Sequence, residues 1–180
     1  GQTNPVYAAM METLDDCVGR VLARLRDLGL EERTIVVFAS DNGGLHVPEG
    51  GEDPPTRNAP FRAGKGFLYE GGLRVPAIVR WPGRIRAGTT VRAPMMNTDF
   101  VPTLLELAGL PVPQDIDGAS FVPLLSGGTA AARRFFWHFP HYTNQGGRPG
   151  GAVRDGDWKM IESYEDARLE LYDLGADPGE

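Results

Sequence analysis

The chain has 180 residues, of which 41% are hydrophobic and 23% are charged, and its formal net charge is −6. That apolar content suffices for a packed core, while the negative charge argues against nucleic acid as a partner. No stretch approaches the roughly 20 apolar residues that a transmembrane helix requires. The single cysteine allows no internal disulfide.

The first predicted element is a long amphipathic helix. Asn4 and Pro5 are typical of an N-cap and a first helical position, and Gly29 is placed to end the helix. Between them apolar residues recur at three- and four-residue spacing, which predicts a face turned toward the core. Cys17 lies on that face, and we expect it to be a small buried hydrophobe.

A buried strand is predicted next, over Ile35–Phe38, where apolar and mostly β-branched or aromatic residues follow one another. A helix followed by such a strand is one step of a mostly parallel α/β sheet flanked by helices. The strand ends at Ser40–Gly44, and open α/β sheets bind ligands just beyond such ends. Asp41 and Asn42 offer oxygen ligands for a hard cation such as Ca²⁺, although both are also ordinary turn residues.

A long loop, residues 45–66, is predicted after this strand because proline, glycine and charge replace any periodicity. Loops of that length are uncommon and usually functional or disordered. Lys65 lies between two glycines, which favours an extended backbone that delivers a cation to one place; a solvated lysine is the simpler alternative. We expect Glu70 and Arg74 to brace this region as an ion pair.

The rest of the chain divides into two predicted parts. Residues 1–126 are assigned to the α/β domain, and residues 127–180 to a small antiparallel subdomain. Turn signals such as Asp155-Gly156 separate the strand patterns of the second part, as in a meander. The later predicted elements are a strand at 77–81, helices at 100–108 and 120–125, and strands at 135–139, 151–154, 158–164 and 169–174.

Several motifs follow one another in a specific order. They are Ser40-Asp41-Asn42-Gly43, Gly64-Lys65-Gly66, the run Glu70–Pro76, and the later stretches Asp99–Gly109 and Asp117–Leu125. In this order they resemble the sulfatase family, namely the formylglycine-dependent arylsulfatase type within the alkaline phosphatase superfamily. The resemblance covers nearly the whole chain.

The resemblance implies a sulfuric ester hydrolase that binds one Ca²⁺ ion. In that family an Asp-Asn pair after the strand supplies two metal ligands, here Asp41 and Asn42. The lysine of the Gly-Lys-Gly stretch binds the sulfate oxygens, which makes Lys65 the expected catalytic and substrate-binding lysine. A divalent metal and a fixed ammonium group stabilise the charge of a sulfate ester in its transition state. The family's C-terminal region shapes the substrate pocket, so His141 and Arg148, near a glycine-rich loop, are candidate substrate contacts.

The chain also departs from the family pattern. The family's nucleophile, a formylglycine made from Cys or Ser, lies in Cys/Ser-x-Pro/Ala-x-Arg, whereas Cys17 is followed by Val-Gly-Arg-Val. Cys17 is therefore not the nucleophile. The paired Asp residues, the second lysine and the histidine that precede this region in the family are missing as well. We expect this chain to be the C-terminal part of a longer enzyme that is periplasmic or secreted. We expect no turnover from these 180 residues alone.

Two other functions stay open. One is hydrolysis of phosphate or phosphonate monoesters, because a metal and a lysine serve either anion. The other is a non-catalytic binding module that keeps the fold. For the sulfatase reading, sulfated glycans and small aryl sulfates are both open as substrates, and nothing in the sequence points to nucleic acid or to a membrane as partner.

Overall fold

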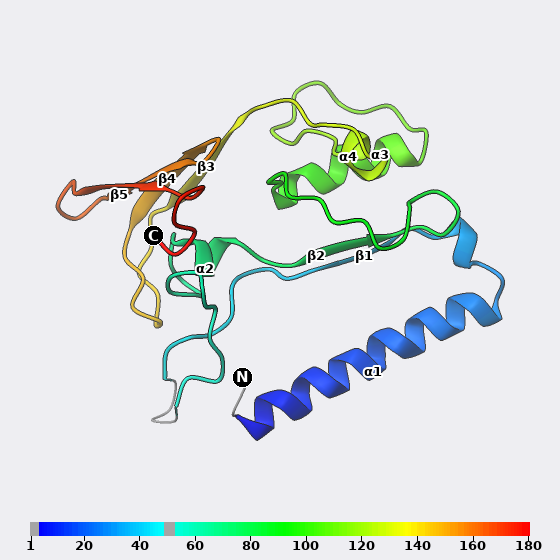
Figure 1. The fold of residues 1–180 in the computed structure, drawn as a ribbon, viewed down its shortest axis with the longest axis horizontal. Coiled ribbons are helices and arrows are strands. Elements are labelled where there is room, and N and C mark those ends of the chain that lie inside the picture. Colours follow the sequence, from blue (N-terminus) through cyan, green and yellow to red (C-terminus); the bar gives the residue numbers. More distant parts are fainter. Residues whose placement is uncertain (1–3, 49–52) are drawn as a thin grey trace.

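The computed structural model describes residues 4–48 and 53–180 (Figure 1). Residues 49–52 of the predicted loop lie outside the described ranges. The described ranges contain, in order, α1 (Pro5–Asp27), η1 (Glu31–Arg33), β1 (Val36–Ala39), α2 (Glu70–Leu73), β2 (Ala77–Arg80), η2 (Asn97–Asp99), α3 (Phe100–Leu107), α4 (Val122–Leu125), β3 (Arg134–Phe139), β4 (Gly150–Asp155), β5 (Trp158–Ser163) and β6 (Leu169–Asp173).

Helix α1 has the predicted ends but not the predicted surroundings. The Asn4 side chain accepts a hydrogen bond from the Tyr7 N–H at 2.9 Å, and Gly29 has the positive φ of a helix-ending glycine. No residue of α1 is buried, and Figure 1 shows the helix running apart from both sheets. The prediction of a buried Cys17 is wrong, since its side chain is exposed. Periodicity identifies the apolar face of a helix, but it does not supply the partner that covers that face.

The two strands of the first sheet pair antiparallel, with Val36 opposite Arg80 and Ala39 opposite Ala77. The prediction of a parallel arrangement is therefore wrong for this pair of strands. The prediction that Ile35–Phe38 is buried on both faces is wrong as well, because Phe38 is 36% exposed. An apolar run indicates a strand, but the direction of its partner depends on the path of the intervening loop. Within the described ranges this sheet has two strands.

The C-terminal meander is confirmed. Strands β3 to β6 form one four-stranded sheet in chain order, and every neighbouring pair is antiparallel. Gly156 has a positive φ in the turn that joins β4 to β5, as the Asp-Gly signal predicts. None of the helices in the described part of the chain is both long and apolar enough to span a bilayer.

The meander shares its core with the segment that precedes α2. Leu68 is buried together with Ala152 of β4 and Ile161 of β5, and the rings of Tyr69 and Trp137 pack against them. The proposed boundary at residue 126 stays a prediction. The shared core means, however, that the segment carrying Lys65 rests on the C-terminal sheet.

Asp99 connects the start of α3 with the residue that precedes β3. Its side chain is 1% exposed and accepts hydrogen bonds from the N–H groups of Met96 at 2.8 Å and Ala119 at 2.9 Å. It also forms an ion pair with Arg133. One helical turn later, Thr103 donates its hydroxyl to the Asp99 carbonyl at 2.6 Å. Helices α3 and α4 thus form a small unit of their own, away from α2 (Figure 1).

A very close backbone contact joins the end of β1 to α2. The Gly43 N–H donates to the Gly72 carbonyl at 3.0 Å. A Cβ atom added to Gly43 would lie 1.7 Å from the carbonyl oxygen of Gly71, so only glycine fits without moving the backbone.

The shared core generates the first prediction. In the intact protein, Leu68→Ala should lower the free energy of unfolding by about 2–5 kcal/mol, because it removes buried atoms and leaves a cavity. Leu171→Ala is the matched control, since Leu171 is 64% exposed, and it should change stability by no more than about 0.5 kcal/mol. Urea denaturation measures both, and equal effects would contradict a core shared with Leu68.

The contact at Gly43 generates the second prediction. Gly43→Ala should destabilise the intact protein by about 1–3 kcal/mol, because the added methyl group overlaps the Gly71 carbonyl. Gly19→Ala, inside α1 with open space around the added atom, should instead stabilise it by about 0.5–1 kcal/mol. Thermal unfolding distinguishes the two. A Gly43→Ala variant as stable as the parent protein would show that the two segments do not lie this close.

Candidate active site

The candidate ligands Asp41 and Asn42 lie directly after β1, in a turn held by short local hydrogen bonds. The Ser40 hydroxyl donates to the Asn42 carbonyl at 2.9 Å, and the Asn42 N–H donates to Asp41 Oδ1 at 3.0 Å. The Asn42 side-chain nitrogen donates to the Gly43 carbonyl at 3.1 Å. These bonds orient the side chains and leave Asp41 Oδ2 and Asn42 Oδ1 as oxygens that a cation can take.

The stretch that carries Lys65 lies beside this turn. The Lys65 N–H donates to the Gly44 carbonyl at 3.2 Å. A Cβ atom added to Gly64 would lie 2.2 Å from the same carbonyl oxygen, which explains a glycine before the lysine. The backbone therefore brings together the two motifs that the sequence separates, and the Lys65 side chain is exposed at their junction.

Asn58 clamps the two stretches together, and sequence reasoning missed it. Its Oδ1 accepts from the Gly44 N–H at 3.0 Å, while its Nδ2 donates to the carbonyls of Gly44 and Ala63, both at 2.9 Å. One amide side chain thus satisfies groups on both sides of the junction. Nothing in the sequence around Asn58 marks it, because its role depends on partners that are distant in sequence.

His46 forms part of the wall behind Gly64. Its ring meets Phe67 edge to face, with 5.1 Å between the ring centroids. Its Nδ1 is buried and has no hydrogen-bond partner within the described ranges, and burial lowers the pKa of His46. Burial thus disfavours the charged form of this ring.

The glycine-rich loop of residues 143–151, called the recognition loop below, adjoins the Lys65 stretch. A Cβ atom added to Gly147 would lie 1.7 Å from the Gly66 carbonyl oxygen, so the two backbones touch. His141 is exposed and its ring meets that of Phe139 edge to face. Arg148 is exposed and forms an ion pair with Glu165 at 3.2 Å. The structure places both side chains at or near this loop, and their substrate contacts stay predictions.

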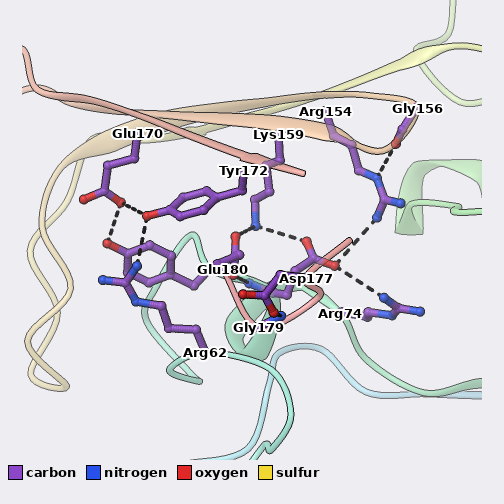
Figure 2. A network of polar contacts seen from close by, with 12 residues as sticks. Arg62, Arg74, Arg154, Gly156, Lys159, Glu170, Tyr172, Asp177, Gly179 and Glu180 are labelled. Carbon is purple, nitrogen blue, oxygen red and sulfur yellow. Dashed lines mark hydrogen bonds and ion pairs between the residues drawn. The ribbon is translucent and has the colours of Figure 1, made fainter. Parts of the chain in front are cut away.

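A cavity of about 290 Å³ lies between Phe67–Tyr69 and the recognition loop, and Arg62, Arg148 and Glu170 help to line it. Figure 2 shows the polar network to which the lining residues Arg62 and Glu170 belong. Glu170 accepts the hydroxyls of Tyr172 at 2.6 Å and Tyr69 at 2.8 Å, and Arg62 donates to the Tyr172 hydroxyl at 2.9 Å. Burial and the bond to Glu170 raise the pKa of Tyr172, so this tyrosine stays protonated.

Asp41 and Asn42 suit a calcium ion as part of a ligand set. One supplies an anionic and the other a neutral oxygen, which are the donors that Ca²⁺ prefers. Ca²⁺ takes about six to eight oxygen ligands, so this pair would be two members of a larger set. No group of three or more His, Cys, Asp or Glu residues that could hold a metal ion occurs in residues 4–48 and 53–180.

Family models match both halves of the chain. The model described as "Sulfatase" matches residues 2–110, and the one described as "N-sulphoglucosamine sulphohydrolase, C-terminal" matches residues 63–180. A sulfatase of Formosa agariphila is 39% identical over 99% of this chain and 35% of its own length. An N-acetylglucosamine-6-O-sulfatase of Bacteroides thetaiotaomicron is 37% identical over 97% of this chain and 30% of its own length.

Solved structures agree with these matches. The structure of BT4656 in complex with its substrate D-glucosamine-2-N,6-O-disulfate has a TM-score of 0.78 and 36% identity, covering 93% of this chain and 33% of that one. A phosphonate monoester hydrolase from Silicibacter pomeroyi has a TM-score of 0.68 and 25% identity, and the match covers 92% of this chain and 33% of the hydrolase chain. Sulfatase neighbours confirm the α/β class with a C-terminal β subdomain. The chain spans about a third of the length of these relatives, and it belongs to the sulfatase family.

Proposed function

We propose that this chain is part of an enzyme that hydrolyses a sulfate ester, with Asp41 and Asn42 as two ligands of a Ca²⁺ ion and Lys65 as the cation that contacts the sulfate oxygens. One observation carries the proposal. The hydrogen bond from the Lys65 N–H to the Gly44 carbonyl fixes the lysine stretch beside the Asp-Asn turn. A cation site and an ammonium group then face one substrate group from neighbouring positions.

The residues of the chain have separate tasks in this proposal. The exposed Lys65 ammonium group donates hydrogen bonds to the sulfate oxygens and offsets their charge, which matters most when charge moves during bond cleavage. Asn58 and the glycines around Lys65 fix the backbone, so that little reorganisation is needed when the substrate binds. When bound, Ca²⁺ would supply a Lewis acid that polarises a sulfate oxygen.

A sulfated sugar is the proposed substrate class. The similarity to BT4656, whose structure holds a disulfated glucosamine, and to an N-acetylglucosamine-6-O-sulfatase supports this choice. His141 and Arg148 are the proposed contacts to the sugar, because the loop that follows His141 lies against Gly66, next to Lys65.

Hydrolysis of a phosphonate monoester is the second candidate. A metal and a lysine hold a phosphonate as readily as a sulfate, and the Silicibacter pomeroyi hydrolase has the same fold over this region. We rank this candidate lower because that enzyme is 25% identical, whereas the sulfatase relatives named above are 36–39% identical. We expect no turnover from residues 1–180 alone, because they contain no Cys/Ser-x-Pro/Ala-x-Arg motif.

The role of Lys65 is tested in the intact protein with 4-nitrophenyl sulfate. Lys65→Ala should lower kcat/KM by about 10²–10³-fold, the usual cost of removing a group that stabilises transition-state charge. The midpoint of thermal unfolding should stay unchanged, because the Lys65 side chain is exposed.

The control is Arg134→Ala, which removes an exposed cation that pairs with Asp155 on the meander. It should leave kcat/KM unchanged. A Lys65→Ala enzyme as active as the parent would refute the role given to this lysine. A parent protein that cleaves phosphonate monoesters but not sulfate esters would favour the second candidate.

A further inference from the structure

We propose that a buried ionic cluster, formed by Glu70, Lys159 and Glu180, is a positioning device for the candidate active site. The inference rests on the proposed function and adds to it. The cluster holds α2 at one fixed place on the C-terminal sheet, and α2 in turn holds the Asp41 turn in place. Lys159 and Glu180 are positioning residues here, since neither one touches the Asp41 turn or Lys65.

Lys159 is the centre of the cluster. Its side chain is 0% exposed, and it stands on β5 between Arg154 of β4 and Tyr172 of β6. The Nζ atom donates to Glu70 Oε1 at 3.0 Å and to Glu180 Oε1 at 2.7 Å (Figure 2). A lysine is almost never fully buried unless it is paired, and here two carboxylates from distant segments pair with it.

Glu180 joins the segment that follows β6 to α2. Its Oε1 accepts from Lys159, while its Oε2 accepts from the backbone N–H of Glu70 at 2.5 Å. The residues just before Glu180 form a turn, in which the Gly179 N–H donates to Asp177 Oδ1 at 2.8 Å. One carboxylate thus binds both a side chain of β5 and the first backbone N–H of α2.

Two further cations lie near the carboxylate of Glu70. Arg154 of β4 lies 3.6 Å and Arg74 lies 3.8 Å from Glu70 Oε2. The pairing of Glu70 with Arg74 agrees with the sequence prediction, but Arg154 and Lys159 were not predicted as its partners. Glu70 therefore collects cations from two strands of the C-terminal sheet and from the segment that follows α2.

Two backbone hydrogen bonds connect the cluster to the site. The Gly71 N–H donates to the Arg62 carbonyl at 2.9 Å, and the Gly72 carbonyl accepts from the Gly43 N–H at 3.0 Å. Arg62 precedes Lys65 by three residues, and Gly43 follows Asn42. A shift of α2 would therefore displace both the metal-ligand turn and the lysine stretch.

Stability alone is a weak explanation for such a cluster. The cost of taking charges out of water offsets much of their attraction, and apolar residues often replace a buried ion pair without loss. Directional hydrogen bonds from one lysine to two carboxylates do, however, define one position of α2 on the sheet. A displacement of about 1 Å in an active site can cost about 10²-fold in rate, so a fixed position of α2 matters for catalysis.

The test is Glu180→Gln in the intact protein. The amide keeps the shape of the side chain and one acceptor oxygen, so either Lys159 or the Glu70 N–H loses its acceptor. We expect kcat for 4-nitrophenyl sulfate to fall by about 10- to 100-fold, with little change in KM, because positioning acts on the reacting geometry. Hydrogen exchange should also become faster at the amides of Gly43 and Lys65.

The matched control is Thr103→Val, which destabilises a part of the fold away from α2. The hydroxyl of Thr103 accepts from the buried Phe121 N–H at 3.0 Å, and valine leaves that group unpaired. Thr103→Val should lower the midpoint of thermal unfolding but leave kcat and the exchange of Gly43 and Lys65 unchanged. All variants are assayed at a temperature at which each one is fully folded.

The outcomes separate the two proposals. If Glu180→Gln lowers only the unfolding midpoint, with kcat and both exchange rates as in the parent, the cluster is merely structural and the positioning inference is wrong. If the parent protein hydrolyses no sulfate ester, the proposed function is wrong. The exchange rates then still decide whether the cluster fixes the two stretches.

Discussion

The close backbone contact between Gly43 and the glycines of α2 is the constraint on which the rest of the structure depends. The Gly43 N–H reaches the Gly72 carbonyl at 3.0 Å, and no side chain fits between the two segments. Because of this contact, a turn that ends one strand lies against a short helix that follows a long loop. This contact, the bond from the Lys65 N–H to the Gly44 carbonyl and the bonds of Asn58 bring the Asp-Asn pair and the lysine stretch together.

The C-terminal sheet fixes the position of α2 and so stabilises this contact. Leu68 enters the core of the sheet, and Lys159 and Glu180 hold α2 by charge and hydrogen bonds. The meander is therefore packed against the segment that carries α2 and shares a core with it. Its contacts determine where α2 lies. Its recognition loop also contacts the backbone of Gly66. Both apolar burial and buried charge act at the same short segment. Its glycines are explained by the close approach of other backbone, since a Cβ atom added to Gly71 would lie 2.3 Å from the Arg62 carbonyl oxygen.

Sequence reasoning predicted those parts of the structure that local chemistry determines. Asn4 and Gly29 mark the ends of α1, and Asp-Gly marks the hairpin between β4 and β5. The family resemblance proposed Asp41, Asn42 and Lys65 as parts of one site, and that role stays a prediction, although the backbones that carry them lie side by side. The structure adds what connects them, namely the clamp at Asn58.

The failures concern partners that are distant in sequence. The antiparallel pairing of β1 with β2 and the exposure of Cys17 both depend on which segment lies opposite, and no local pattern encodes that. Lys159 did carry a usable signal, because it occupies the same inward face of β5 as Ile161. A lysine at an inward position predicts a buried carboxylate partner, but the pattern does not say that the partners are Glu70 and Glu180.

The central claim is that the Asp-Asn turn and Lys65 form one site for a metal ion and a sulfate group. Anomalous diffraction from crystals of the intact protein, grown with Ca²⁺ and sulfate, tests it most directly. The account predicts a calcium peak within coordination distance of Asp41 and Asn42, about 2.3–2.6 Å, and a sulfate oxygen within hydrogen-bond distance of Lys65 Nζ. A calcium ion bound elsewhere, with Lys65 turned away from the sulfate, would contradict it.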